Sequence, residues 1–184
     1  MTARFKGFTL VELLIVIAII GVLAVVVLIA INPVEQLAKT RDAGRISTVT
    51  QLGHAVQAYY TSHATQTDPY PLAATWNADL TASGELTVFP SGIAYTGSPD
   101  VCTENDEPGT DATYCYDLDL SGAIPPGAIV YSRLESLNQN NKCTSPDIAF
   151  VLFSTADGRG GVVCAADALP GSINPLNSGL FDYK

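Results

Sequence analysis

The sequence predicts an α+β protein in which a long N-terminal helix packs on a small antiparallel sheet. Three observations support this fold class. An uninterrupted apolar run occupies the N-terminus, a one-sided helical pattern follows it, and the rest of the chain consists of short β-branched segments separated by turns. The first two patterns have the spacing and length of helices, whereas the third has the length and composition of strands.

The apolar run is long enough to cross a membrane. From Leu13 to Ile31 there are 19 residues without a charge, an amide or a hydroxyl group. A helix of this length spans about 28 Å, which is close to the thickness of the hydrocarbon core of a bilayer. Arg4 and Lys6 precede the run, and the next basic residue is Lys39. This asymmetry predicts a single-pass protein of the cytoplasmic membrane with a cytoplasmic N-terminus.

Glu12 is the unexpected residue at the start of this run. It lies five residues after Gly7, in the stretch Gly7-Phe8-Thr9-Leu10-Val11-Glu12. Membrane insertion does not require a carboxylate at this place, and an ionised side chain in hydrocarbon is costly unless it has a partner. We therefore expect Glu12 to have a function.

This stretch resembles the N-terminus of type IV pilins and of type II secretion pseudopilins, which carry a short basic leader. The resemblance implies that a prepilin peptidase cuts between Gly7 and Phe8, and that Phe8 is then N-methylated. It also implies an ion pair between Glu12 and the free amine of Phe8 in a neighbouring subunit, since opposite charges attract strongly where the dielectric is low. The alternatives are a secretory signal peptide, for which this run is too long, and a plain signal anchor.

An amphipathic helix is expected after the apolar run. Asn32 and Pro33 suit an N-cap and a first-turn proline, so a kink or a restart is predicted there. Turn-forming residues follow from Thr61, so the helix is expected to end at about Ser62. The expected apolar stripe is Leu37, Ile46, Val49, Leu52, Val56 and Tyr59 or Tyr60, and the expected polar face is Lys39, Arg41, Asp42, Arg45, Gln51 and Gln57.

Residues 64–184 are expected to form one β-rich head on the apolar stripe of that helix. Two of the expected strands flank residues 155–160, where Asp157-Gly158 suits a hairpin turn. The expected strands are Gly92–Thr96, Tyr114–Leu118, Ala128–Leu134, Ile148–Ser154 and Gly161–Ala165. The resulting organisation is a leader at 1–7, a transmembrane and filament-core helix at 8–31, an amphipathic helix at 32–63 and a head at 64–184, which the resemblance identifies as a pilin fold.

The head carries most of the acidic residues. It holds 15 acidic and four basic residues, so its net charge is −11. Such a surface repels phosphate groups, and direct nucleic-acid binding is therefore not expected. We interpret the negative charge of the head as keeping an exposed surface soluble, rather than as a site that binds a cationic partner.

Four cysteines lie in the head, on the exported side of the membrane. An even number of cysteines in an oxidising compartment predicts two disulfides, for which three connectivities exist. We favour the pairing of nearest neighbours, Cys102–Cys115 and Cys143–Cys164, and the second of these resembles the C-terminal disulfide loop of many type IV pilins. Zinc binding is the alternative, but the spacings lack Cys-x-x-Cys and no histidine is near.

One acidic cluster is a weak candidate for calcium. Its members are Glu104, Asp106, Glu107 and Asp111, which offer the oxygen ligands that calcium prefers but do not follow the EF-hand pattern. A solvated acidic loop is the favoured interpretation, and no metal is expected. We expect His54 and His63 to be surface or packing residues.

The sequence predicts a structural protein rather than an enzyme, because it contains none of the common catalytic motifs. No cofactor is expected. The resemblance implies a subunit that waits in the cytoplasmic membrane and then polymerises into an extracellular type IV pilus. Its implied partners are copies of itself, a prepilin peptidase and methyltransferase, an assembly platform and minor pilins. A secretion pseudopilin is the first alternative, and head length and the Cys143–Cys164 loop favour the pilus. A signal-anchored surface binding module that never polymerises is the alternative from another class.

Overall fold

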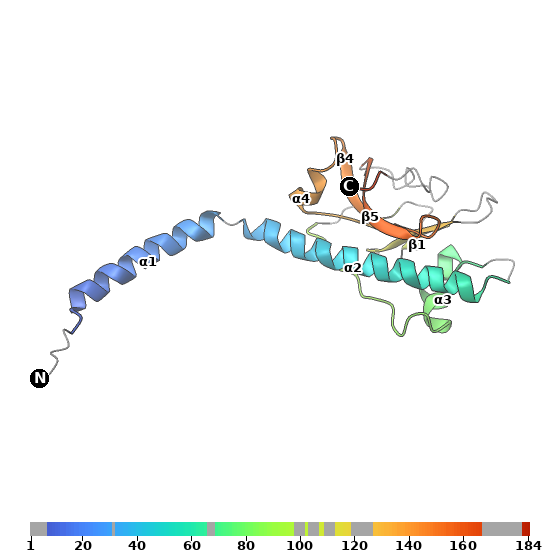
Figure 1. Cartoon of the computed structure of the whole chain (residues 1–184), viewed down its shortest axis with the longest axis horizontal. Helices are drawn as coiled ribbons and strands as arrows, with labels where there is room; N and C mark the ends of the chain where they lie inside the picture. The colour runs from blue at the N-terminus through green and yellow to red at the C-terminus, as the bar shows by residue number, and fades with distance from the viewer. Residues whose placement is uncertain are drawn as a thin grey trace, which may run out of the picture. The chain divides into compact units, whose positions relative to one another are not determined.

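The computed structural model describes residues 7–30, 32–65, 69–97, 102, 107–108, 113–118, 127–166 and 182–184. The chain forms two compact units, Met1–Leu37 and Ala38–Lys184. The smaller unit contains an apolar helix, and the larger unit contains an antiparallel sheet with helices packed on it (Figure 1). The predicted α+β class is confirmed.

Helix α1 (Leu10–Ala30) is apolar on all sides. Its segment Leu10–Leu28 is long and apolar enough to cross a membrane, with a mean hydropathy of 3.2, and none of it is buried within the chain. Leucine, isoleucine and valine side chains exposed on all sides of a helix require an apolar environment. Lipid or the apolar surface of another protein can supply that environment.

Helix α2 (Pro33–Ser62) begins with the predicted cap. The backbone N–H of Glu35 donates to Oδ1 of Asn32 at 3.3 Å, and Pro33 occupies the first helical position, where no N–H is needed. Since α1 ends at Ala30, the restart at Asn32-Pro33 is confirmed. The helix also ends at Ser62, as the sequence predicts.

The face of α2 that packs in the larger unit follows most of the predicted stripe. Val49, Leu52 and Val56 are fully buried. Leu37 was expected in this stripe but is 60% exposed, so that prediction is wrong. A Cβ on Gly53 would lie 2.2 Å from Cγ of Phe153, which shows that the glycine allows this ring to pack directly on the helix backbone.

The sheet contains five antiparallel strands in the order β1-β2-β3-β4-β5. In the β4–β5 hairpin, Ser154 pairs with Arg159, and Gly158 has a φ of 64° in the predicted turn. The strands are β1 (Glu107–Pro108), β2 (Cys115–Leu118), β3 (Ala128–Arg133), β4 (Asp147–Ser154) and β5 (Arg159–Ala166). Four predicted strands are therefore present, with ends shifted by one or two residues.

The predicted strand Gly92–Thr96 is wrong, because this segment forms no strand. Its backbone groups bind side chains instead of a neighbouring strand. The carbonyls of Ile93 and Ala94 accept hydrogen bonds from Arg45, and the N–H of Thr96 donates to Glu135. Buried backbone groups need partners, and here distant charged side chains supply them.

Both faces of the sheet carry apolar residues, which alternate along each strand. Val130, Val151 and Phe153 face α2 and α3, whereas Tyr131 and Phe150 belong to a second cluster on the opposite face. The sequence did not predict the short helices η1 (Ala73–Thr75), α3 (Trp76–Ala82) and α4 (Leu137–Asn140). Each of them is too short to show a clear helical period in the sequence.

Two disulfides fasten the ends of this sheet. They join Cys102 to Cys115 and Cys143 to Cys164, which is the pairing that the sequence favoured. The first disulfide ties Cys102 to β2, and the second ties the loop after α4 to β5.

Candidate functional site

Thr9 and Glu12 form a reciprocal cap at the N-terminus of α1. The backbone N–H and the hydroxyl of Thr9 both donate to Oε2 of Glu12 at 2.8 Å. In return, the backbone N–H of Glu12 donates to Oγ1 of Thr9 at 3.3 Å. This arrangement is a capping box, which satisfies two N–H groups that the helix itself leaves without partners.

The capping box gives Glu12 a role that our sequence analysis missed. The signal was present in the sequence as a threonine followed three residues later by a glutamate, just before an apolar run. The positive end of the helix dipole and the two Thr9 donors stabilise the ionised carboxylate. The negative charge of Glu12 is therefore partly stabilised by groups of its own helix, before any neighbouring molecule binds it.

One oxygen of Glu12 remains available to a second partner. Both Thr9 donors bind Oε2, and Oε1 accepts no hydrogen bond within the part of the chain that the structure describes. A carboxylate offers about four acceptor positions, so the cap leaves capacity for an ammonium group. Thr9 therefore holds the carboxylate in one position without occupying it fully.

Gly7 and Phe8 lie just before α1 and are not helical. Phe8 is 78% exposed. A Cβ added to Gly7 would meet no atom within 4 Å, so packing among the described residues does not require glycine there.

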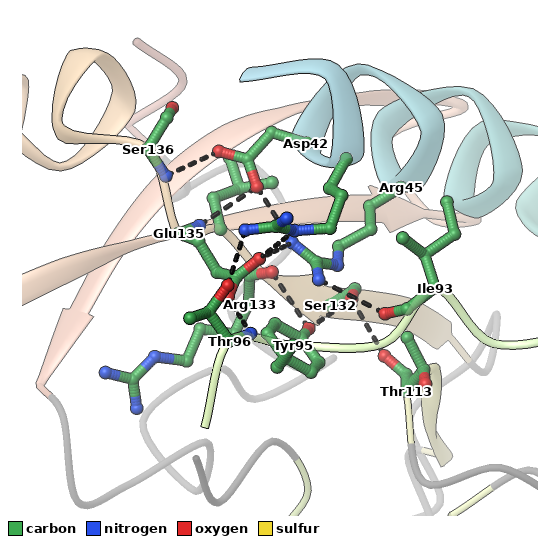
Figure 2. A network of polar contacts seen from close by, with 12 residues as sticks. Asp42, Arg45, Ile93, Tyr95, Thr96, Thr113, Ser132, Arg133, Glu135 and Ser136 are labelled. Atoms are coloured by element: carbon green, nitrogen blue, oxygen red, sulfur yellow. Dashed lines mark hydrogen bonds and ion pairs between the residues drawn. The ribbon is translucent and has the colours of Figure 1, made fainter. Parts of the chain in front are cut away.

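The larger unit contains a buried ion-pair network, which Figure 2 shows. We expected Asp42 and Arg45 on the polar face of α2, but both are buried, so this prediction is wrong. Nη1 of Arg45 donates to Oδ1 of Asp42 and to Oε2 of Glu135, both at 2.9 Å. The guanidinium also lies 3.8 Å from the centre of the Tyr95 ring, a cation–π contact.

Each carboxylate in this network has several donors. Asp42 accepts the backbone N–H groups of Glu135 and Ser136 at 2.9 and 2.8 Å. Glu135 accepts Nε of Arg41 at 2.9 Å and the N–H of Thr96 at 2.5 Å. Burial raises the pKa of Glu135, but the Thr96 N–H and the two arginines outweigh burial, so the pKa is lowered overall.

The network connects three segments that are distant in the sequence. Helix α2 contributes Asp42 and Arg45, the loop at residues 93–96 contributes backbone groups, and the chain after β3 contributes Glu135. A Cβ on Gly44 would lie 2.6 Å from Cδ1 of Ile93, so this glycine lets the loop approach the helix. With both carboxylates held by several donors, the arrangement suits a structural clamp rather than proton transfer.

The weak calcium candidate of the sequence lies almost entirely outside the described residues. Glu104, Asp106 and Asp111 lie outside the described residues, and Glu107 is described only as part of β1. Among the residues that are described, no group of three or more histidines, cysteines and acids could hold a metal ion. His54 contacts the ring of Phe153, and His63 stacks on Tyr59 with ring centres 3.9 Å apart.

Comparisons with known proteins bear on the N-terminal segment. Residues 2–28 match the family model of the prokaryotic N-terminal methylation motif. The comparison with curated proteins found no match, and the comparison with solved structures found none either. The matched range includes the capping box, Gly7, Phe8 and most of α1. The chain therefore carries the leader signature of type IV pilins and pseudopilins, which indicates a pilin-like or pseudopilin-like precursor.

Proposed function

We propose that this protein is a structural subunit of a type IV pilus. Its leader is removed between Gly7 and Phe8, Phe8 is methylated, and copies of the chain polymerise through α1 into a filament on the cell surface. The observation that carries the proposal is the methylation motif at residues 2–28, which includes an apolar helical segment, Leu10–Leu28, with no buried side chain. Such a helix has two suitable environments, the bilayer before assembly and other copies of α1 afterwards.

Glu12 supports the proposal through its arrangement at the start of α1. Its Oε2 binds Thr9, whereas Oε1 is directed to no partner in the described chain. The free amine of a processed Phe8 in a neighbouring subunit would bind at this carboxylate. A carboxylate that its own helix already holds in position loses little conformational entropy when the amine binds.

The first test is processing of the full chain. Co-expression with a prepilin peptidase is expected to give a product whose N-terminal residue is Phe8, and mass spectrometry can measure this together with methylation. Gly7→Ala is expected to abolish cleavage, although none of the described residues packs against that position. A product that begins at Met1 or Thr2 would support a signal-anchored binding module instead.

The second test separates the charge of Glu12 from its capping role. Glu12→Gln keeps a side chain that can complete a capping box but removes the negative charge. We expect Glu12→Gln to reduce surface filaments at least tenfold in electron micrographs, and Thr9→Ser to leave their number unchanged. Normal filaments from Glu12→Gln would reject the ion pair while leaving the processing result intact.

A pseudopilin of a type II secretion system is the second candidate, since the same motif precedes pseudopilins. The Cys143–Cys164 disulfide favours the pilus, because the loop that it closes resembles the C-terminal disulfide loop of many type IV pilins. Deletion of the gene, with separate assays for surface pili and for secreted proteins, distinguishes the two. Loss of secretion with intact pili would favour the pseudopilin.

A further inference from the structure

The first two turns of α2 carry an apolar face that the described residues do not cover. Val34 and Leu37 are 63% and 60% exposed. Both belong to the smaller unit, which ends at Leu37, whereas the next residue, Ala38, is buried and belongs to the larger unit. Residues three and four positions apart share a helix face, so Val34 lies on the same face as Leu37 and Ala38. The apolar face of α2 therefore continues toward its N-terminus beyond the residues that the larger unit buries.

Polar residues occupy the other side of these two turns, at positions 32, 35, 36 and 39. Gln36 follows Asn32 by four residues, and Lys39 follows Glu35 by four, which is the spacing of side chains on one helix face. Gln36 and Lys39 are exposed. The start of α2 is therefore amphipathic. Helices with an apolar stripe opposite polar and charged residues are typical of the boundary between lipid headgroups and acyl chains.

The backbone at the start of α2 needs few water molecules. Pro33 has no N–H group to satisfy. The N–H of Glu35 donates to Oδ1 of Asn32 at 3.3 Å, and the N–H of Gln36 donates to the carbonyl oxygen of Asn32 at 3.2 Å. Three of the first four helical positions are thus provided for within the chain. Unsatisfied backbone groups are costly where water is scarce, so this helix start suits the edge of a bilayer.

The covalent chain keeps this face close to any membrane that α1 crosses. Val34 follows Ala30, the last residue of α1, by four residues, so the two lie at most about 14 Å apart. The headgroup region on each side of a bilayer is about 5–8 Å thick. Each anchored chain therefore presents Val34 and Leu37 near lipid at any protein concentration, whereas contact with a second copy requires a high concentration. This difference favours lipid as the partner.

We propose that the apolar face formed by Val34 and Leu37 inserts between lipid headgroups when α1 spans a bilayer, so that the first two turns of α2 lie along the membrane surface. Helix α1 ends at Ala30 and α2 begins at Pro33, and this break allows the two helices to take different directions. The inference rests on the membrane anchoring in the proposed function and adds a second contact with lipid.

The depth of single residues in a bilayer tests the proposal. All four cysteines of the chain form disulfides, so an added cysteine is a unique site for an NBD fluorophore. The full chain is placed in nanodiscs of phosphatidylcholine and phosphatidylglycerol, one chain in each disc, with a nitroxide lipid whose spin label lies near the headgroup. We expect quenching of NBD at Val34→Cys and at Leu37→Cys to exceed that at Gln36→Cys at least about twofold.

The order of quenching along the helix separates this arrangement from a helix that leaves the membrane along its normal. In that second case, depth decreases steadily with residue number, and Gln36→Cys is quenched more than Leu37→Cys. This order would overturn the proposal. Ser47→Cys is the aqueous control, because Ser47 is exposed on the part of α2 that belongs to the larger unit. Quenching at Ser47→Cys equal to that at Leu37→Cys would also overturn the proposal, since the contact would not be specific to the apolar face.

A label within α1 distinguishes failure of this inference from failure of the proposed function. We expect Ile20→Cys to be quenched by a nitroxide placed deep in the acyl chains. Without that quenching, the membrane anchoring is wrong, and the inference is wrong with it. If Ile20→Cys is quenched but Leu37→Cys is quenched no more than Gln36→Cys, the inference alone is wrong.

A second substitution tests whether the apolar face causes the insertion. We expect Val34→Gln to lower the quenching of the label at Leu37→Cys at least about twofold. Val88→Gln is the matched control, because Val88 is 75% exposed and lies outside α2, and it should leave the quenching unchanged. Equal quenching with Val34→Gln and Val88→Gln would overturn the proposal. So would a label at Leu37→Cys that is shielded from water only in discs with several chains, because the partner would then be a second copy.

Discussion

Glu12 in the smaller unit and Asp42 in the larger unit are both helical carboxylates with a partner three residues away. Glu12 binds Thr9, and Asp42 binds Arg45. The two carboxylates differ in the hydrogen bonds that they accept beyond that local pair. Glu12 has one oxygen without a hydrogen bond in the described chain, whereas both oxygens of Asp42 also accept backbone N–H groups from residues 135 and 136. A carboxylate held only locally can serve a partner outside the chain, whereas one held from several segments stabilises the fold.

The largest effect is expected from breaking the clamp of the larger unit. Arg45→Leu leaves Asp42 buried without its guanidinium partner and also leaves the carbonyls of Ile93 and Ala94 without donors. We expect a loss of about 3–5 kcal/mol in the free energy of unfolding. Trp76 is the single tryptophan of the chain and is buried, so its fluorescence can follow urea unfolding of the full chain in detergent.

Arg41→Leu is the matched control for this prediction. Arg41 lies on the same helix and binds the same Glu135, but 26% of its side chain is exposed. An ion pair that water reaches contributes about 1 kcal/mol or less. Equal losses in the free energy of unfolding for the two variants would show that the burial of Arg45 does not increase its contribution to stability.

The next effect concerns the packing of α2 on β4. Gly53→Ala adds a methyl group where Phe153 lies 2.2 Å away, so the ring or the helix must shift. We expect a loss of about 1–3 kcal/mol, despite the higher helix propensity of alanine. Gly21→Ala in α1 is the control, because a Cβ there meets no atom within 4 Å and should leave Trp76-detected unfolding unchanged.

The same contrast explains what the sequence could and could not predict. The cap at Asn32, the two helix ends and the β4–β5 hairpin depend on residues within a few positions of each other, and these were predicted. The burial of Asp42 and Arg45 depends on Glu135, which is 93 and 90 residues away from them, so helical periodicity assigned both residues to the wrong face of the helix. The Thr9–Glu12 capping box is also local, so it could have been predicted from the threonine and the glutamate three residues later.

A smaller effect on stability is expected when the pH is lowered. The pKa of Glu135 is lowered in the folded state from its ordinary value near 4.5, so its ionised form stabilises the fold. This contribution is complete above the unfolded pKa and is lost as the pH falls through the lower, folded pKa. We expect unfolding midpoints to decrease below about pH 4.5, and Glu135→Gln to decrease less steeply over that interval. Parallel curves for the two proteins would contradict this assignment.

The smallest effect is expected at the start of α1. Thr9→Ala removes the N-cap and leaves Glu12 with its charge, so the cost should be about 1 kcal/mol and confined to the first turn. Faster hydrogen exchange of the Glu12 amide would measure it, while unfolding detected at Trp76 should not change. Thr9→Ser restores the cap and should restore protection. If Thr9→Ala left the Glu12 amide as protected as in the wild type, the cap would not hold Glu12, and the carboxylate would depend on a neighbouring subunit for its position.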